Sequence, residues 1–209
     1  MDGLIGKKVG MTQVWDSQGR FIPVTVLEVG PCPVLQVKQP AREGYAAVQV
    51  GFRPQKPQRL TKALRTRCEK AGVPPCSELR EFGLDANESV KVGDTITVGI
   101  FEGVALVDVT AISKGRGFAG AVRRFRMAGG PHGHGGHSKR RIGSIGERNL
   151  PGWVRKGKPM PGHMGASQVT TRNLAVVQLR PEDNVLLVHG AVPGPVGGRV
   201  IVRKALKKA

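Results

Sequence analysis

The sequence has few aromatic residues and no long apolar run, and each shortage excludes a class of protein. Aromatic residues make up only 4% of the 209 residues. That is too few for the stacking platforms with which RNA-recognition and oligonucleotide-binding folds hold single-stranded bases. No stretch reaches 18 consecutive apolar residues, and no basic amphipathic stripe is long enough to lie in a membrane interface. A membrane partner is therefore not expected.

Cysteine is also scarce. The three cysteines, Cys32, Cys68 and Cys76, are an odd number and show no C-x-x-C spacing. Residues 1–8 lack the order of charge, apolar run and small-residue cleavage site that a signal peptide requires. These features predict a reduced, cytoplasmic compartment, with the cysteines as small packing residues.

Acidic residues are almost missing from residues 114–172. This segment holds thirteen Lys and Arg against one acid, Glu147, so it nets +12 of the chain's +18. It also holds fourteen Gly and four Pro, and few large apolar side chains. Such a segment buries too little apolar surface to offset its chain entropy, so alone in water it should be disordered. Its charges need a dense array of anions, which nucleic acid supplies.

The remaining residues read mainly as short strands, rich in β-branched residues and bounded by Gly and Pro. One helix is expected over residues 60–71, with Gly72 as its stop. Many strands with one embedded helix favour a small β-barrel over a βαβ sheet. The fold class is therefore predicted as mainly β, with residues 1–113 and 173–209 as the barrel, a helical insert at about 59–72, and residues 114–172 as a long irregular basic loop extension. Strands are predicted over 21–29, 34–38, 45–52, 77–82, 95–101, 103–112, 174–179, 185–189 and 199–203.

Two glycine-rich patterns resemble nucleotide-binding motifs. Residues 115–120 (GRGFAG) match G-x-G-x-x-G after a strand and before a possible helix at 121–125. A dinucleotide-binding fold needs a second buried strand and an acid about twenty residues after this motif, and the sequence has neither there. Contact with an RNA phosphate is therefore the preferred interpretation. Residues 152–159 nearly match a P-loop, but Pro159 stands where Ser or Thr must reach magnesium.

A cluster of three histidines suggests a metal, but the pattern argues against one. His132, His134 and His137 have no carboxylate among them, the nearest cysteine in sequence is Cys76, and the flanking glycines give no rigid scaffold. No carboxylate pair or nucleophile stands beside a base at meaningful spacing. We expect no metal, no cofactor, no small-molecule substrate and no catalytic site.

Ordered motifs along nearly the whole chain resemble a known family, the third protein of the large ribosomal subunit, bacterial type. Its signature is matched by F-x6-D-x2-A-x-S-x-G-R-G-x2-G-x3-R over residues 101–124. The other matching motifs are LIGKKVGMT (4–12), GSIG (143–146), PG-x-V-x-KGK (151–158), M-x-G-x-MG (160–165) and LV-x-GAVPG (187–194).

The resemblance implies a structural ribosomal protein with a β-barrel and a long loop threaded into large-subunit rRNA towards the peptidyl transferase centre, the part around residues 153–164 lying deepest. It also implies early binding near the 3′ end of the rRNA, nucleation of subunit assembly, and neighbours among proteins fourteen and nineteen of the subunit.

The alternatives are a nucleotide-dependent oxidoreductase, which would bind nicotinamide or flavin, and a DNA-compacting protein, which would bind duplex DNA and rRNA alike. The residues expected to contact rRNA are Lys114, Arg116, Arg123, Arg124, Arg126, His132, His134, His137, Lys139, Arg140, Arg141, Arg148, Trp153, Arg155, Lys156, Lys158, His163 and Arg172.

Overall fold

The chain folds into two compact units, seen in a computed structural model that describes residues 1–16, 18–84 and 89–206. The first, the barrel unit, comprises Met1–Ile112 and Gln168–Ala209. The second, the basic unit, is the intervening Ser113–Ser167. The barrel unit is described first, because the chain enters and leaves the basic unit through two of its strands.

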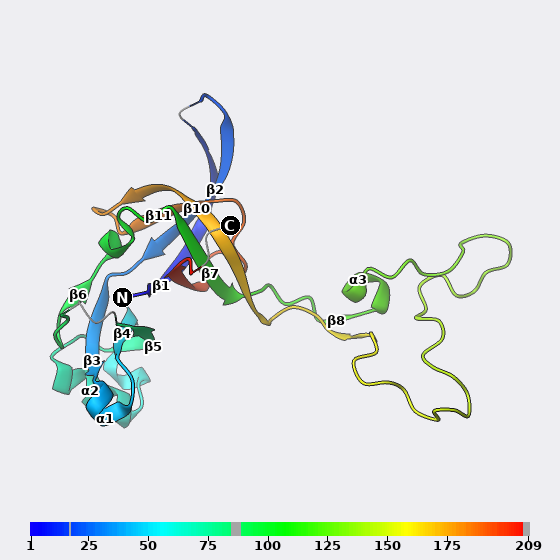
Figure 1. Ribbon diagram of the computed structural model, residues 1–209, viewed down its shortest axis with the longest axis horizontal. Coiled ribbons are helices and arrows are strands. Elements are labelled where there is room, and N and C mark those ends of the chain that lie inside the picture. The colour runs from blue at the N-terminus through cyan, green and yellow to red at the C-terminus, as the bar shows by residue number, and fades with distance from the viewer. Residues whose placement is uncertain (17, 85–88, 207–209) are drawn as a thin grey trace. The chain divides into compact units, whose positions relative to one another are not determined.

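Six antiparallel strands close the barrel in the order β1-β12-β7-β10-β11-β2 (Figure 1). Alternation of buried and exposed side chains builds its inside, as in β7, where Val107, Val109 and Ala111 are buried and their neighbours are more exposed. The predicted small β-barrel is confirmed. The strands are β1 (Gly3–Trp15), β2 (Phe21–Val29), β7 (Leu106–Ile112), β10 (Gln168–Arg180), β11 (Val185–His189) and β12 (Arg199–Lys204).

A second antiparallel sheet, in the order β5-β4-β3-β6, shares the core of the barrel. Phe82, Val48 and Val50 of this sheet belong to the same buried cluster as Leu4 and Leu27 of the barrel strands. One continuous apolar core therefore holds both sheets, and most of the hydrophobic stabilisation of the unit comes from it. The strands of this second sheet are β3 (Cys32–Lys38), β4 (Ala47–Pro54), β5 (Cys76–Gly83) and β6 (Thr95–Ile96).

Short helices connect these strands. Helix α2 ends at Gly72, whose φ of 67° is left-handed and whose amide donates to the carbonyls of Cys68 and Glu69, so the predicted helix and its stop are confirmed. The helical elements of the barrel unit are α1 (Pro40–Glu43), η1 (Pro57–Arg59), α2 (Lys62–Ala71) and η2 (Val98–Phe101).

Strand β1 was not predicted from the sequence. Its residues, GLIGKKVGMTQVW, mix glycines and lysines with apolar residues and hide the alternation. Lys8 is buried and its Nζ donates to the carbonyl of Val192 at 2.7 Å, so a charged residue occupies an interior position. A buried charge of this kind needs the tertiary partner that the sequence pattern does not show.

Two other strand predictions were wrong in extent. Residues 95–101 form strand only at Thr95–Ile96, and then a 3₁₀ turn buries Val98 and Phe101 in the core. Strand β10 begins at Gln168, well before the expected start at residue 174. Residues 168–171 pair with β7, and a register shift follows, where Asn173 has φ of 54° and its amide donates to Asp108 Oδ1 at 2.8 Å. A bulge thus interrupts one long strand and conceals its first part.

We predict that the buried cysteines resist alkylation until the protein unfolds. All three are free and buried, and burial raises the pKa of Cys32 to about 12 and that of Cys76 to about 11. Iodoacetamide at pH 8 should therefore leave both unmodified in the native protein and modify both in denaturant, as mass spectrometry would show. Because folding raises these pKa values, the stability they contribute is full below about pH 8.5 and falls as the pH rises towards 11. Rapid native labelling of Cys32 or Cys76 would contradict the packing described here.

Candidate nucleic-acid interface

The basic unit begins and ends in a two-stranded ribbon. The Ser113 amide donates to the Ser167 carbonyl at 2.9 Å, and the Arg116 amide donates to the Met164 carbonyl at 2.9 Å. The Met164 amide returns a bond of 2.9 Å to the carbonyl of Gly117. These bonds hold the first and last parts of the unit together. The paired strands are β8 (Phe118–Ala119) and β9 (Gly162–His163).

Glycine is required at one position of this ribbon. Gly165 has φ of 76°, and a Cβ there would collide with the carbonyl oxygen of Lys114. Any other residue would be strained and would push the two strands apart. The sequence pattern did not predict this ribbon, because its strands are too short to show alternation.

Arg124 fastens helix α3 (Ala121–Phe125) beside the ribbon. Its Nη1 donates to the Met160 carbonyl at 2.7 Å, and its guanidinium carbon lies 5.0 Å from the centroid of the Phe125 ring. A Cβ on Gly162 would come within 2.8 Å of that Nη1, so the bare glycine makes room for the guanidinium. Arg124 was expected to contact rRNA, and the structure shows that it also donates a hydrogen bond within the unit itself.

Beyond α3 the unit is irregular. A few backbone bonds cross its glycine-rich loops, such as that from the Gly130 amide to the Lys139 carbonyl at 3.1 Å and that from the Gly136 amide to the Gly133 carbonyl at 3.1 Å. Among the described residues, no amide between residues 142 and 157 donates a hydrogen bond to another backbone carbonyl. Figure 1 shows this part of the chain, green to yellow, as loops without strands.

The cations of the predicted interface are free to meet a partner. Only Arg124 is half-buried, and the other seventeen predicted contact residues are exposed. None of them forms an ion pair among the described residues, since every pair found there joins residues of the barrel unit. The exposed ones are Lys114, Arg116, Arg123, Arg126, His132, His134, His137, Lys139, Arg140, Arg141, Arg148, Trp153, Arg155, Lys156, Lys158, His163 and Arg172.

Comparison with known proteins identifies the family. The family model for ribosomal protein L3 matches residues 80–185. Over 208 residues the chain is 45% identical to large ribosomal subunit protein uL3 of Brachyspira pilosicoli, covering 100% of this chain and 95% of that protein. It is 46% identical over 208 residues to the protein of the same name from Deinococcus radiodurans, covering 99% of this chain and 96% of that one. The Solibacter usitatus protein is 48% identical over 205 residues, covering 97% of this chain and 98% of that one.

The chain belongs to the ribosomal protein L3 family. It is therefore a structural constituent of the large ribosomal subunit, associated with large-subunit rRNA and other ribosomal proteins, and it is not an enzyme. Bacterial members of the family are part of cytoplasmic ribosomes, in agreement with the predicted compartment. Separately, no helix within the described residues is long and apolar enough to cross a membrane.

The glycine motif of this L3 family member is not a dinucleotide site. Residues 115–120 run into β8 of the antiparallel ribbon, and the helix that follows has only five residues. Every strand pair among the described residues is antiparallel, whereas a dinucleotide fold needs parallel strands. The oxidoreductase alternative is therefore wrong.

The structure places two of the predicted arginines in a groove of the basic unit. This groove has a volume of about 520 Å³ and is lined by Gly120, Ala121, Ser138, Arg140, Arg141, Ile142, Gly143 and Pro161. It offers two guanidinium groups and a hydroxyl next to small residues that permit close approach. A phosphate is the ligand that such groups recognise.

His163 and Arg172 lie differently from the expected arrangement. No group of three or more His, Cys, Asp or Glu side chains that could hold a metal ion occurs in the part of the chain that the structure describes. His163 lies in β9 opposite Phe118, in the paired ribbon and not at the end of a loop. Arg172 lies in β10 of the barrel unit, because that strand starts earlier than expected.

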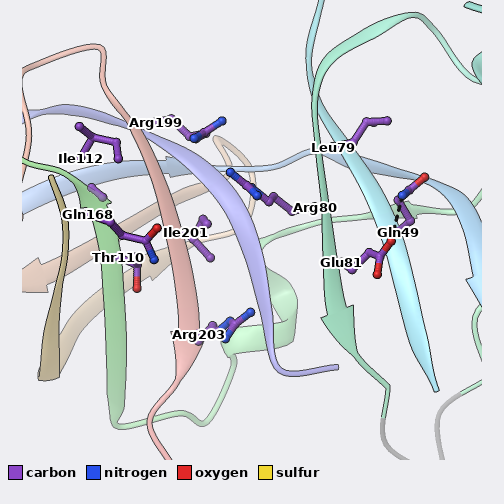
Figure 2. Close-up of a pocket in the computed structure, with 11 residues that line it drawn as sticks. Gln49, Leu79, Arg80, Glu81, Thr110, Ile112, Gln168, Arg199, Ile201 and Arg203 are labelled. Carbon is purple, nitrogen blue, oxygen red and sulfur yellow. Dashed lines mark hydrogen bonds between the residues drawn. The ribbon is translucent and has the colours of Figure 1, made fainter. Parts of the chain in front are cut away.

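The barrel unit has a groove of its own, shown in Figure 2. It has a volume of about 430 Å³, and Arg80, Arg199 and Arg203 stand around it. Arg199 pairs with Glu78 at 3.3 Å and Arg203 with Asp2 at 3.9 Å. Most of the positive charge of this groove is thus compensated within the barrel unit.

The carboxylate in the barrel groove is unsuited to proton transfer near neutral pH. Hydrogen bonds to Glu81, first from Lys38 and then from Tyr45, lower the pKa of this carboxyl below its ordinary value. The Lys38 Nζ lies 2.7 Å from Glu81 Oε1, and Gln49 donates to the same oxygen at 3.2 Å. Glu81 stays ionised as part of a structural network, in keeping with a protein that performs no catalysis.

We predict that hydrogen exchange in the free protein separates the ribbon from the loops. The amides of Arg116 and Met164 should exchange more slowly than those of residues 143–157, because only the former donate backbone hydrogen bonds. Gly165→Ala should abolish the protection of Arg116 and Met164 and leave the amides of β7 unchanged. Strong protection across residues 143–157 would show that the loops are ordered without a partner.

Proposed function

We propose that the basic unit is the main rRNA-binding element of this chain, and that it threads into large-subunit rRNA towards the peptidyl transferase centre. We propose further that binding occurs early, near the 3′ end of the rRNA, and nucleates assembly of the subunit. The route of the loop and the order of assembly follow from the resemblance to the family. The contact residues follow from the physical chemistry of the unit.

The absence of internal charge compensation carries this proposal. The only acid among residues 114–172 is Glu147, and none of the Lys and Arg there pairs with a carboxylate among the described residues. Exposed like charges at this density repel one another and disfavour a compact state. Folded rRNA removes that repulsion, because each strand presents a regular row of phosphates and releases counterions on binding.

The chemistry of the basic unit favours contact with the RNA backbone over reading of bases. Arginine guanidinium groups bind phosphate oxygens through two parallel hydrogen bonds. Few rings are available for stacking: the exposed aromatic side chains of the unit are Phe118, Phe125 and Trp153. Recognition by backbone and shape is the usual mode for folded RNA, and it fits a loop rich in glycine and arginine.

The irregular loops support a role in threading. A chain with few internal hydrogen bonds and little buried apolar surface can follow a path set by RNA and become ordered as it binds. The ordering entropy is then offset by the many charge-assisted contacts formed in the same step. This is why the loops need no core of their own.

An apolar face on the β1–β2 hairpin supports neighbouring proteins as further partners, and we propose proteins fourteen and nineteen of the subunit. Strand β1 pairs with β12 only as far as Lys7 but continues beside β2 to Trp15. Met11, Trp15 and Phe21 are 52%, 67% and 51% exposed, and the two rings meet edge to face with centroids 4.0 Å apart. Exposed apolar clusters of this kind mark contacts with other proteins.

Changing Lys139, Arg140 and Arg141 together to Ala should weaken rRNA binding and flatten its salt dependence. Each neutralised phosphate contributes roughly 0.7 to 0.9 to the slope of log K against log salt, so the slope should fall by about two units. The measurement is a titration of full-length protein with large-subunit rRNA at several salt concentrations. The matched control changes Arg20, Arg42 and Arg180, three exposed cations of the barrel unit, to Ala. An equal loss in both variants would mean that the basic unit has no special part in binding.

Substitution of His163 should affect the ribosome more than the isolated protein. His163 is exposed and makes no side-chain hydrogen bond among the described residues, so His163→Ala and His163→Gln should leave the melting temperature nearly unchanged. Because we place residues 153–164 near the peptidyl transferase centre, reconstituted subunits should show an altered peptidyl-transfer rate or drug sensitivity. If the variants gave ribosomes with unchanged activity but lowered the melting temperature of the isolated protein, His163 would instead serve the fold of the ribbon.

A further inference from the structure

A second concentration of positive charge lies in the barrel unit, on the chain around helix α2. Residues 53–70 contain seven Lys and Arg and a single acid, Glu69. The predicted interface does not include them, and the sequence pattern assigned this stretch only a helix. The seven are Arg53, Lys56, Arg59, Lys62, Arg65, Arg67 and Lys70.

These cations are exposed and only two of them have polar partners among the described residues. Arg65 pairs with Glu69 at 3.5 Å, and Arg67 Nη1 donates to Gln49 Oε1 at 2.8 Å. The remaining five, including Lys62 and Lys70, form no ion pair there. The patch is therefore positive in the folded protein as well as in the sequence.

Two of the unpaired lysines border a groove along one face of α2. The groove has a volume of about 740 Å³, and Leu35 and Val92 line it opposite the helix. Lys62, Thr66 and Lys70 follow one another at intervals of four residues, which places them in a row on the helix. Ala63 and Ala71, beside this row, are small and leave the groove accessible.

Stability of the isolated protein does not explain this arrangement. Only Cys68 of α2 is buried, in a small cluster with Leu35 and Val73. No acid stands in the first turn of the helix, whereas Lys62 does, and a cation near a helix N-terminus is unfavourable. The electrostatics of the helix thus favour an external anion.

We propose that the α2 groove holds the sugar-phosphate backbone of a segment of rRNA, as a second RNA-binding site separate from the basic unit. In this site Lys62, Arg67 and Lys70 contact phosphates, whereas the Thr66 hydroxyl is not a donor to the RNA, because it already donates to the Lys62 carbonyl at 2.9 Å. No aromatic side chain lines the groove, so it holds the backbone and does not read bases. The inference rests on the proposed function, since it takes the partner to be the same rRNA.

Two sites on one chain would strengthen binding beyond the affinity of either. Once one site is engaged, the second meets RNA at the effective concentration set by the chain that links them. The barrel would then bind rRNA directly and would not serve only as a support for the basic unit.

The first test changes Lys62 and Lys70 to Gln in the full-length protein and measures binding to large-subunit rRNA across salt concentrations. Loss of two phosphate contacts should lower the log–log slope by about 1.5 units. The control, Arg42→Gln with Arg180→Gln, removes the same charge from exposed positions outside the groove and should leave the slope nearly unchanged. The variant Lys62→Arg with Lys70→Arg should retain binding, and thermal melting verifies that each variant is folded. Equal slopes for the groove variant and its control would overturn the proposal.

The second test identifies the partner by photo-crosslinking. A photoreactive amino acid replaces Ala63, which is exposed, and the protein is then assembled into large subunits. Crosslinks to rRNA, at nucleotides different from those reached from Trp153, are expected. Crosslinks to a ribosomal protein, or none to RNA, would overturn the proposal.

The two tests also separate this inference from the function proposed for the basic unit. If the groove variant binds normally while the Lys139, Arg140 and Arg141 variant is impaired, only the α2 site is wrong. If the groove variant is impaired while the other binds normally, the α2 site stands and the role of the basic unit is wrong.

Discussion

The antiparallel pairing of β7 with β10 is the constraint on which the rest of the structure depends. It sets Ile112 opposite Gln168, so the chain leaves the barrel unit and returns to it at adjacent positions (Figure 1). The entropic cost of closing a loop grows only logarithmically with its length, and the strand pairing fixes the two ends in advance. A long insertion without a core of its own is therefore compatible with a cooperatively folded barrel. The bond from the Ser113 amide to the Ser167 carbonyl continues the same pairing into the basic unit.

The two units follow opposite physical rules. The barrel unit buries Leu4, Leu27, Val48, Phe82 and Phe101 in one continuous cluster and pairs six of its acids with bases among the described residues. The basic unit buries little more than Ala119 and Ala121 and leaves its cations uncompensated. The first arrangement stabilises a fold in water, and the second requires a polyanion. A structural component of the large ribosomal subunit needs both, because it must remain folded before assembly and bind RNA during it.

Positive charge in this chain does not follow the boundary between the units. Residues 53–70 hold seven Lys and Arg against one acid, yet they lie in the barrel unit, around the 3₁₀ helix η1 and helix α2. In contrast, Arg199 and Arg203 of the barrel groove are paired with Glu78 and Asp2. Whether a cation is available to a partner thus depends on the carboxylates that the fold brings beside it, and not on its place in the sequence.

The sequence by itself determined the fold class, most strands and the existence of an uncompensated basic segment, because these depend on composition and on short-range periodicity. The strand at Val185–His189 and the helix that stops at Gly72 are local patterns of this kind. The tertiary structure decided what depends on partners distant in the chain. Lys8 is an interior residue because the Val192 carbonyl accepts a hydrogen bond from its Nζ, β10 starts at Gln168 because β7 lies beside it, and Arg124 donates a hydrogen bond to the Met160 carbonyl. No local pattern predicts these three outcomes, since each depends on a hydrogen-bond partner that only the folded chain supplies.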